Sequence, residues 1–253
     1  MKKRFGQHFL SDPSILRRIV QFAEIGPEDT VLEIGPGAGS LTRELASAAR
    51  RVIAVEIDKD LLPQLHASMP ENVEIIEGDA LAIEFPSGPV HLVGNLPYNV
   101  ATPLFKKFID HRNTILDVTI MIQKEVADRL RAKPGAGEYG PLSILIQYYA
   151  SVKYGFRVSA GAFRPPPKVD SAVVRLEWKP GVPDAKPFTD FVHQAFGSRR
   201  KKLVNNLASM FGSIGREELL RRLEKAGVPA DARPEELSVD EFLRVYNQFQ
   251  HAD

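Results

Sequence analysis

The stretch that most constrains the fold is an apolar strand that ends in a glycine-rich turn, Val31-Leu32-Glu33-Ile34-Gly35-Pro36-Gly37-Ala38-Gly39. Glycines lack a Cβ, so the backbone of such a turn can approach a ligand closely at the carboxyl end of the strand. A helix that begins near Ser40 would direct free N–H groups at the same ligand. The spacing is G-x-G-x-G, whereas dinucleotide-binding proteins have G-x-G-x-x-G. The turn therefore predicts a nucleotide-like ligand and argues against an NAD-dependent oxidoreductase.

Apolar strands and amphipathic helices alternate after this turn, and alternation is typical of a mostly parallel α/β sheet. Further strands are expected at residues 51–58, 73–79, 90–94, 117–123, 152–158 and 172–178, and helices at about 13–22, 40–49, 59–68, 102–111, 124–131 and 141–149. This gives a sheet of seven strands. Right-handed crossovers would place the carboxyl ends of its parallel strands at one edge, in a single crevice.

Residues 179–187 (Lys-Pro-Gly-Val-Pro-Asp-Ala-Lys-Pro) have the composition of a linker. They predict two domains, residues 1–180 with an N-terminal arm over 1–12, and residues 187–253. Amphipathic repeats in the second domain indicate that it is entirely helical. These repeats are Leu219, Leu220 and Leu223, and Phe242, Val245, Tyr246 and Phe249.

Composition excludes several classes of protein. The net charge is +1, so any affinity for nucleic acid must come from local basic patches. Cysteine is absent, which excludes disulfides and thiolate metal sites and suits a reducing, cytoplasmic compartment. The basic start is not followed by an apolar run, so no signal peptide is expected, and no stretch is apolar for long enough to span a membrane. We also expect no bound metal.

Carboxylates stand at three of the expected strand ends. Glu56 lies about twenty residues beyond the glycine turn, where a carboxylate can accept both hydroxyls of a ribose, although a solvated acid is the alternative. Asp79, followed by Ala80, could accept from an adenine amine or could be a turn residue. Glu33 could hold the glycine loop or meet an ammonium group of the ligand.

A second motif, Asn95-Leu96-Pro97-Tyr98, follows the strand at 90–94. Pro97 favours an extended backbone at Leu96, so the Leu96 carbonyl can face the crevice beside the Asn95 amide oxygen. Two acceptors suit an amine such as that of adenine, and Tyr98 can stack on the base. The alternative is an ordinary turn.

The two motifs together resemble the S-adenosylmethionine-dependent RNA adenine N6-dimethyltransferases. The opening Phe5-Gly6-Gln7-His8-Phe9-Leu10 and the segments Phe163–Ser171 and Ala195–Leu203 are also similar to that family, so the resemblance runs from residue 5 to about 211. The triple proline at 165–167 and the Phe-x-x-Arg-Arg-Lys segment look more like the KsgA-type small-subunit enzymes than the Erm macrolide-resistance enzymes. His8 departs from the family, in which many members have asparagine.

The resemblance implies a Rossmann-like methyltransferase domain over 1–180 and a small helical RNA- or ribosome-binding domain over 187–253. It implies that Phe163 stacks on the target adenine, although a buried core aromatic is the alternative. With the residues argued above, the candidate cofactor-binding residues are His8, Leu10, Glu33, Gly35, Gly37, Gly39, Glu56, Asp79, Ala80 and Asn95. The candidate catalytic residues are Asn95, Leu96, Pro97, Tyr98 and Phe163.

The densest basic run is Arg199-Arg200-Lys201-Lys202. A solvated helix face is its ordinary explanation, and a phosphate-binding patch is the alternative. The candidate RNA-binding residues are Arg164, Lys168, Arg199, Arg200, Lys201 and Lys202. Together with Lys2, Lys3 and Arg4 they would form a basic rim around the crevice.

The expected function is therefore dimethylation of two adjacent adenosines in a 3'-terminal hairpin loop of 16S ribosomal RNA, with S-adenosylmethionine as methyl donor. The expected partner is the small ribosomal subunit, and the protein is expected to act as a monomer. An Erm-type enzyme for large-subunit RNA and a non-catalytic ribosome assembly factor are the two alternatives.

Overall fold

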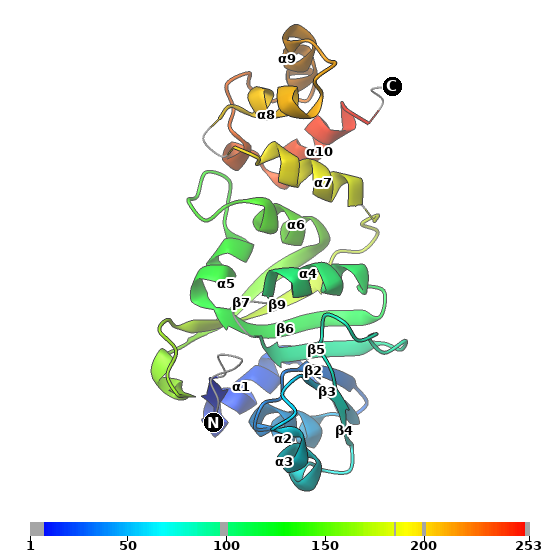
Figure 1. Cartoon of the computed structure of the whole chain (residues 1–253), viewed down its shortest axis with the longest axis vertical. Helices are drawn as coiled ribbons and strands as arrows, with labels where there is room; N and C mark the ends of the chain where they lie inside the picture. Colours follow the sequence, from blue (N-terminus) through cyan, green and yellow to red (C-terminus); the bar gives the residue numbers. More distant parts are fainter. Residues whose placement is uncertain (1–7, 97–100, 185, 199–200, 251–253) are drawn as a thin grey trace. The chain divides into compact units, whose positions relative to one another are not determined.

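The computed structural model describes residues 8–96, 101–184, 186–198 and 201–250 (Figure 1). Its contacts divide the chain into two compact units, Met1–Ala127 with Ser151–Trp178, and Asp128–Ala150 with Lys179–Asp253. Residues 128–150, which the sequence analysis included in the first domain, group with the second unit because the helix over 141–149 contacts the helices at 186–195 and 239–247. The domain limits of 1–180 and 187–253 stay a prediction.

The first unit is built on a seven-stranded sheet with the order β4-β3-β2-β5-β6-β9-β7. The strands are β2 (Thr30–Ile34), β3 (Arg51–Glu56), β4 (Val73–Glu77), β5 (Val90–Asn95), β6 (Ile115–Gln123), β7 (Ala150–Val158) and β9 (Ser171–Trp178). Strands β2 to β6 pair in parallel, and β9 pairs antiparallel with β6. The mostly parallel α/β sheet predicted from the sequence is thus confirmed.

The strand order reverses between β2 and β5. The chain runs outward from β2 through β3 to β4, and β5 then returns to the other side of β2. Gly94 makes the close pairing of β5 with β2 possible, because a Cβ at this position would lie 2.7 Å from the Ile34 carbonyl oxygen. Ligands of open α/β sheets bind at such a reversal, outside the carboxyl ends of the strands.

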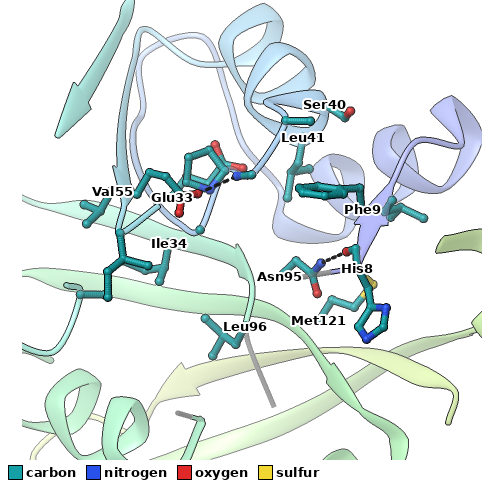
Figure 2. A pocket seen from close by; sticks show the side chains of 18 of the residues that line it. His8, Phe9, Glu33, Ile34, Ser40, Leu41, Val55, Asn95, Leu96 and Met121 are labelled. Atoms are coloured by element: carbon teal, nitrogen blue, oxygen red, sulfur yellow. Dashed lines mark hydrogen bonds between the residues drawn. The ribbon is translucent and has the colours of Figure 1, made fainter. Parts of the chain in front are cut away.

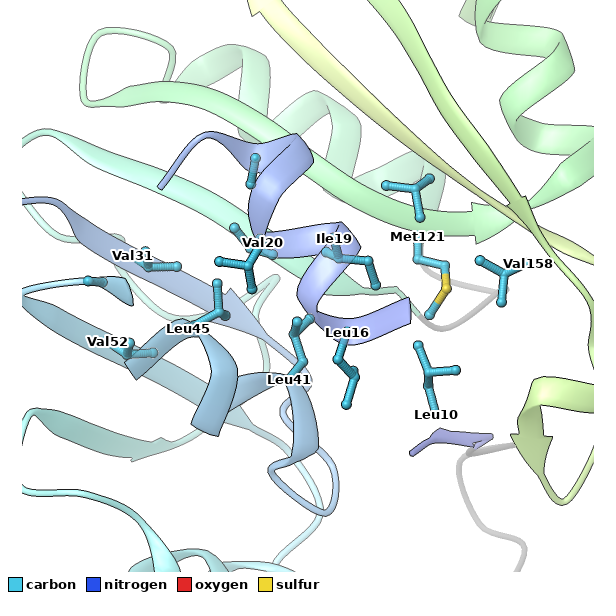
Figure 3. Close-up of a cluster of buried hydrophobic side chains, with 14 of the residues drawn as sticks. Leu10, Leu16, Ile19, Val20, Val31, Leu41, Leu45, Val52, Met121 and Val158 are labelled. Atoms are coloured by element: carbon cyan, nitrogen blue, oxygen red, sulfur yellow. The ribbon is translucent and has the colours of Figure 1, made fainter. Parts of the chain in front are cut away.

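Helices α1 (Pro13–Ala23) and α2 (Ser40–Ala48) cover one face of this sheet. Asp12 caps α1, since its Oδ1 accepts a hydrogen bond of 2.8 Å from the Ser14 amide, and Pro13 fills the first helical position. Leu16, Ile19, Leu41 and Leu45 then pack on Val31, Val52 and Met121 of the sheet (Figure 3). Each buried side chain of this size stabilises the fold by about 1.5–3 kcal/mol, so the cluster holds the glycine turn between β2 and α2 in place.

The first unit has several further elements, two of which contribute Leu10 and Phe163 to this cluster. They are α3 (Leu62–Ser68), α4 (Ala101–Asp110), the start of α5 (Lys124–Arg131), the 3-10 helix η1 (Ala160–Ala162) and two short strands, β1 (Phe9–Leu10) and β8 (Phe163–Arg164). Strands β1 and β8 pair antiparallel with each other, and Leu10 lies opposite Phe163. This pairing was not predicted from the sequence.

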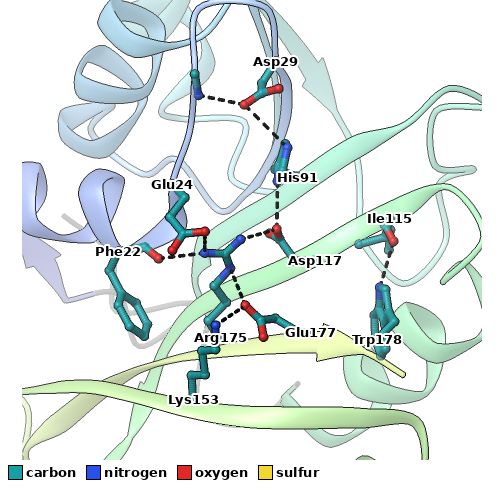
Figure 4. A network of polar contacts seen from close by, with 11 residues as sticks. Phe22, Glu24, Asp29, His91, Ile115, Asp117, Lys153, Arg175, Glu177 and Trp178 are labelled. Atoms are coloured by element: carbon teal, nitrogen blue, oxygen red, sulfur yellow. Dashed lines mark hydrogen bonds and ion pairs between the residues drawn. The ribbon is translucent and has the colours of Figure 1, made fainter. Parts of the chain in front are cut away.

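A polar network lies in the same sheet, away from the carboxyl ends of the parallel strands (Figure 4). Arg175 of β9 donates through Nη2 to Asp117 Oδ2 at 2.8 Å and pairs through Nη1 with Glu24 Oε2 at 2.5 Å. His91 Nδ1 lies 3.0 Å from the same Asp117 oxygen. The Arg175 and Asp117 side chains are each 8% exposed, so this is a buried ion pair that links β5, β6 and β9.

The second unit contains helices α6 (Pro141–Tyr149), α7 (Lys186–Ala195), α8 (Leu203–Met210), α9 (Arg216–Lys225) and α10 (Val239–Asn247), with the 3-10 helix η2 (Pro234–Glu236). Aromatic rings form its core, and Tyr246 contacts both Phe188 and Phe191 with ring centroids 5.4 Å apart. In the described part of this unit, all regular elements are helices, except that its Ala150 is the first residue of β7. None of the helices described here is both long and apolar enough to cross a bilayer.

Candidate functional site

A cavity of about 550 Å³ lies at the strand-order reversal, within the first unit (Figure 2). Its size is that of a small-molecule site. Of the residues proposed from the sequence, it is lined by His8, Leu10, Glu33, Gly35, Gly37, Glu56, Asp79, Ala80, Asn95, Leu96 and Phe163. The prediction that the glycine turn and the strand ends share one crevice is thus confirmed, while the role of each residue stays a prediction.

The three glycines of the turn have φ values of +71°, +58° and +79° at Gly35, Gly37 and Gly39. These values favour glycine. Gly37 faces the cavity beside the arm, since a Cβ there would lie 3.0 Å from Phe9 Cε1. Gly39 does not line the cavity, and a Cβ at Gly39 would lie 2.4 Å from Met69 Cε. The missing Cβ of Gly39 therefore serves the packing of the turn against Leu65 and Met69, and its proposed contact with the cofactor stays a prediction.

Glu56 is held in place by two backbone amides. Its Oε2 accepts from Gly37 at 3.0 Å and its Oε1 accepts from Asp58 at 2.8 Å. Burial raises the pKa of Glu56, and these two amides oppose the rise. Each carboxylate oxygen can accept a second hydrogen bond, so Glu56 can take a diol from the cavity side.

Glu33, at the end of β2, is only 1% exposed. Burial raises the pKa of Glu33 to about 8; the Thr42 hydroxyl opposes the rise and the Glu56 carboxylate adds to it. Its Oε2 has no hydrogen-bond partner among the described residues. No backbone amide of the glycine turn donates to Glu33 in that part of the chain, although such a contact is expected of a carboxylate that braces the loop.

The loop after β4 carries Asp79 to the cavity. Asp79 Oδ1 accepts from the Leu81 amide at 2.9 Å, so the residue does serve as a turn residue, and it also lines the cavity. The large apolar side chains of Ile57 and Leu81 line the same cavity, yet they are 44% and 36% exposed. Two exposed apolar surfaces suit the faces of a purine. Neither residue was predicted from the sequence, although each is an apolar residue that follows a strand-end acid within two positions.

Asn95 is oriented by the arm. Its Nδ2 donates to the His8 carbonyl oxygen at 3.3 Å, so Oδ1 points away from that carbonyl (Figure 2). Leu96 follows with a buried side chain, and its amide donates to the Met121 carbonyl at 3.1 Å. Pro97 and Tyr98, the other two residues of the motif, lie outside the described residues.

Residues 8–10 of the arm contact β8 and the residue that follows it. His8 Nδ1 lies 2.7 Å from the Pro165 carbonyl oxygen, which can only accept, so Nδ1 carries the proton. Phe163 of β8 is 1% exposed and belongs to the hydrophobic cluster, although it also lines the cavity. The structure therefore shows the buried aromatic that was the alternative explanation, and stacking of Phe163 on a base stays a prediction.

The basic candidates are exposed where the structure describes them. Arg164 donates to the carbonyls of Gly161 and Phe163, at 2.9 and 3.0 Å. Lys168 is exposed, as are Lys201 and Lys202 before α8. Arg199 and Arg200 lie outside the described residues. Within the ranges that the structure covers, no group of three or more histidine, aspartate and glutamate side chains could hold a metal ion.

The parallel sheet, its strand-order reversal and the glycine turn define a Rossmann-like methyltransferase fold. The sequence model of the family "Ribosomal RNA adenine dimethylase" matches residues 1–251, and the chain belongs to this family. A ribosomal RNA small subunit methyltransferase A from Pseudomonas fluorescens is 42% identical and covers 98% of this chain and 93% of its own length.

Two solved structures share the fold over nearly the whole chain. A dimethyladenosine transferase from Plasmodium falciparum has a TM-score of 0.82 at 29% identity and covers 96% of this chain and 97% of its own. The 23S rRNA methyltransferase ErmE has a TM-score of 0.71 at 29% identity and covers 95% of this chain and 98% of its own.

Proposed function

We propose that this chain transfers methyl groups from S-adenosylmethionine to the exocyclic amines of two adjacent adenosines in a 3'-terminal hairpin loop of small-subunit (16S) ribosomal RNA. It would act as a monomer on the small ribosomal subunit, in the cytoplasm, during ribosome biogenesis. The observation that carries the proposal is the meeting of Glu33, Glu56 and Asn95 in one cavity at the strand-order reversal.

The residues of the cavity fit S-adenosylmethionine. Gly37 has no Cβ, so the Phe9 ring can lie against the turn at the edge of the cavity, and Glu56 can accept the two ribose hydroxyls. Ile57 and Leu81 can flank the adenine, with Asp79 at its amine. The buried Glu33 Oε2 without a partner suits the ammonium group. Bound there, the cofactor supplies an electrophilic methyl group.

The chain's own residues then position the target. An adenine flipped out of the RNA would donate from its amine to Asn95 Oδ1 and to the Leu96 carbonyl, which turns the nitrogen lone pair toward the methyl group. Positioning supplies most of the acceleration. No general base is needed, because the nitrogen becomes cationic and strongly acidic as the methyl group arrives, and the proton can leave to water. A second transfer requires room for the first methyl group.

The alternatives have less support. Identity is higher to the small-subunit enzyme from Pseudomonas fluorescens than to ErmE, which favours the small subunit over an Erm-type target. Glu56, Asp79 and the Asn95–Tyr98 motif are all present, which favours an enzyme over a non-catalytic assembly factor.

Incubation with tritiated S-adenosylmethionine and unmethylated small or large subunits, followed by mapping of the label, separates the three functions. Label in two adjacent adenosines of small-subunit RNA is the expected result. Label in the large subunit would indicate an Erm-type enzyme. Binding to small subunits without label would indicate an assembly factor.

The basic run can be tested by charge reversal. Arg199→Glu combined with Arg200→Glu should weaken binding to small subunits by at least about tenfold at moderate salt, because two cations that neutralise phosphates become anions. The measurement is a binding titration at several salt concentrations. The control is Arg17→Glu with Arg50→Glu, which makes the same charge change at exposed positions of the first unit. Unchanged affinity in the Arg199/Arg200 variant would refute the patch.

The arm can be tested at Phe9, whose ring lies against the glycine turn. Phe9→Ala should raise the Kd for S-adenosylmethionine about 5- to 30-fold, which corresponds to about 1–2 kcal/mol of lost apolar contact. Phe22→Ala is the matched control, since Phe22 is also a partly buried phenylalanine of the first unit but does not line the cavity. Equal Kd values for the two variants would contradict a role of the arm in holding the cofactor.

A further inference from the structure

The Glu33 carboxyl group is buried, and no cationic side chain in the described part of the chain compensates it. It lies at the end of β2, is 1% exposed and lines the cavity, and its Oε2 has no partner in the described part of the chain. An ionised carboxylate in such a position is strongly disfavoured, so the group takes up a proton unless a cation arrives.

The described groups around Glu33 do not supply that cation. Helix α2 contributes the Thr42 hydroxyl, and β3 contributes the Glu56 carboxylate, whose oxygens are held by two backbone amides. Strand β5 brings Asn95, a neutral amide that is already bonded to the arm. The arm brings His8, whose Nδ1 is directed at the Pro165 carbonyl. The neighbouring carboxylate and the burial together raise the pKa of Glu33 above neutrality.

We propose that Glu33 is a neutral carboxylic acid in the cofactor-free protein at neutral pH and releases its proton to solvent when the ammonium group of S-adenosylmethionine enters the cavity. This inference rests on the proposed cofactor. The balance is one O–H bond broken at Glu33, one carboxylate–ammonium contact formed, and one proton passed to the buffer. Glu33 thereby selects nucleoside ligands that carry an amino-acid ammonium over those that do not.

Linkage gives this exchange a pH dependence. Below the pKa of Glu33 the proton must be removed before the ion pair can form, so affinity for S-adenosylmethionine should rise about tenfold per pH unit between pH 6 and pH 7. The dependence should flatten above the pKa of Glu33, and the Glu33→Gln variant should not show it.

Calorimetric titration at pH 7, in two buffers with different ionisation enthalpies, measures the protons released on binding. Three ligands separate the charges: S-adenosylmethionine, S-adenosylhomocysteine, which keeps the ammonium but lacks the sulfonium, and 5'-methylthioadenosine, which lacks both. We expect the first two to release most of one proton and the third to release none, since a group with a pKa of about 8 is mostly protonated at pH 7. In Glu33→Gln, any proton release comes from the ligand's own amine. The difference in proton release between the wild type and this variant is therefore the contribution of Glu33.

The outcomes are distinct. Equal proton release by the wild type and Glu33→Gln, or by S-adenosylmethionine and 5'-methylthioadenosine, would overturn the inference and leave the cofactor assignment standing. Release with S-adenosylmethionine but not with S-adenosylhomocysteine would overturn the assignment to the ammonium. Failure of the wild type to bind S-adenosylmethionine would overturn the proposed function together with the inference. The comparison of ligands uses the wild-type chain alone, so it holds even if Glu33→Gln does not fold.

Discussion

Replacing Asn95 by alanine should lower the rate constant of methyl transfer by about 10²–10³-fold, the effect of losing a preorganised polar contact worth about 2.7–4 kcal/mol at the transition state. The side chain has two functions in the structure. Its Nδ2 is bonded to the His8 carbonyl, and its Oδ1 points away from the arm as one of the two proposed acceptors for the adenine amine. Single-turnover transfer from tritiated S-adenosylmethionine to small subunits measures the rate constant directly.

Asn72→Ala is the matched control for this substitution. Asn72 is also a partly buried asparagine whose Nδ2 donates to backbone carbonyls, those of Ala46 and Ala49 at 2.8 and 3.2 Å, but it does not line the cavity. We expect it to lower stability and to leave the transfer rate unchanged. A rate within twofold of the wild type for Asn95→Ala would refute the role of Asn95.

The parts of the fold that could be predicted from the sequence are those in which local pattern and topology agree. Strands β2 and β3 are nearly continuous apolar runs, and a glycine turn or an acid marks where each one ends. The common edge follows from right-handed crossovers alone, so the meeting of Glu56 and Asn95 required no knowledge of side-chain packing. Helices α5 and α6 have the predicted bounds.

The parts that could not be predicted depend on contacts between distant segments. Strands β1 and β8 have two residues each and lie about 150 positions apart, too short for any periodicity to appear. The sequence around Gly39 gives no sign that its missing Cβ faces Met69. The burial of Glu33 was equally hidden, because a strand-end acid has the same local pattern whether it is solvated or enclosed.

Replacing Arg175 by methionine should lower the free energy of unfolding of the first unit by about 3–5 kcal/mol, because Asp117 is then left buried without its guanidinium partner. Trp178, the chain's single tryptophan, lies on the same strand β9, and its Nε1 donates to the Ile115 carbonyl at 2.8 Å. Urea unfolding followed by tryptophan fluorescence therefore reports on this unit. Arg51→Met is the matched control, since Arg51 pairs with Glu74 at the surface and its loss should cost only about 0–1 kcal/mol.

The loss at Arg175 should also depend on pH through His91. The hydrogen bond to Asp117 raises the pKa of His91, and the nearby Arg175 charge opposes that rise. A histidine whose pKa is raised in the folded protein stabilises the fold at a pH below its unfolded pKa, which is near 6.5. This stabilisation is lost as the pH rises through the folded pKa. Without Arg175, the protonated His91 can partly compensate the Asp117 charge at pH 6, but the neutral His91 cannot do so at pH 8. The difference in the free energy of unfolding between the wild type and Arg175→Met should therefore be larger at pH 8 than at pH 6.

The double variant Arg175→Met with Asp117→Leu should recover much of the lost free energy of unfolding, because it leaves no buried carboxylate. A loss below about 1 kcal/mol for Arg175→Met alone would show that the pair behaves like a solvated surface pair and does not brace the sheet.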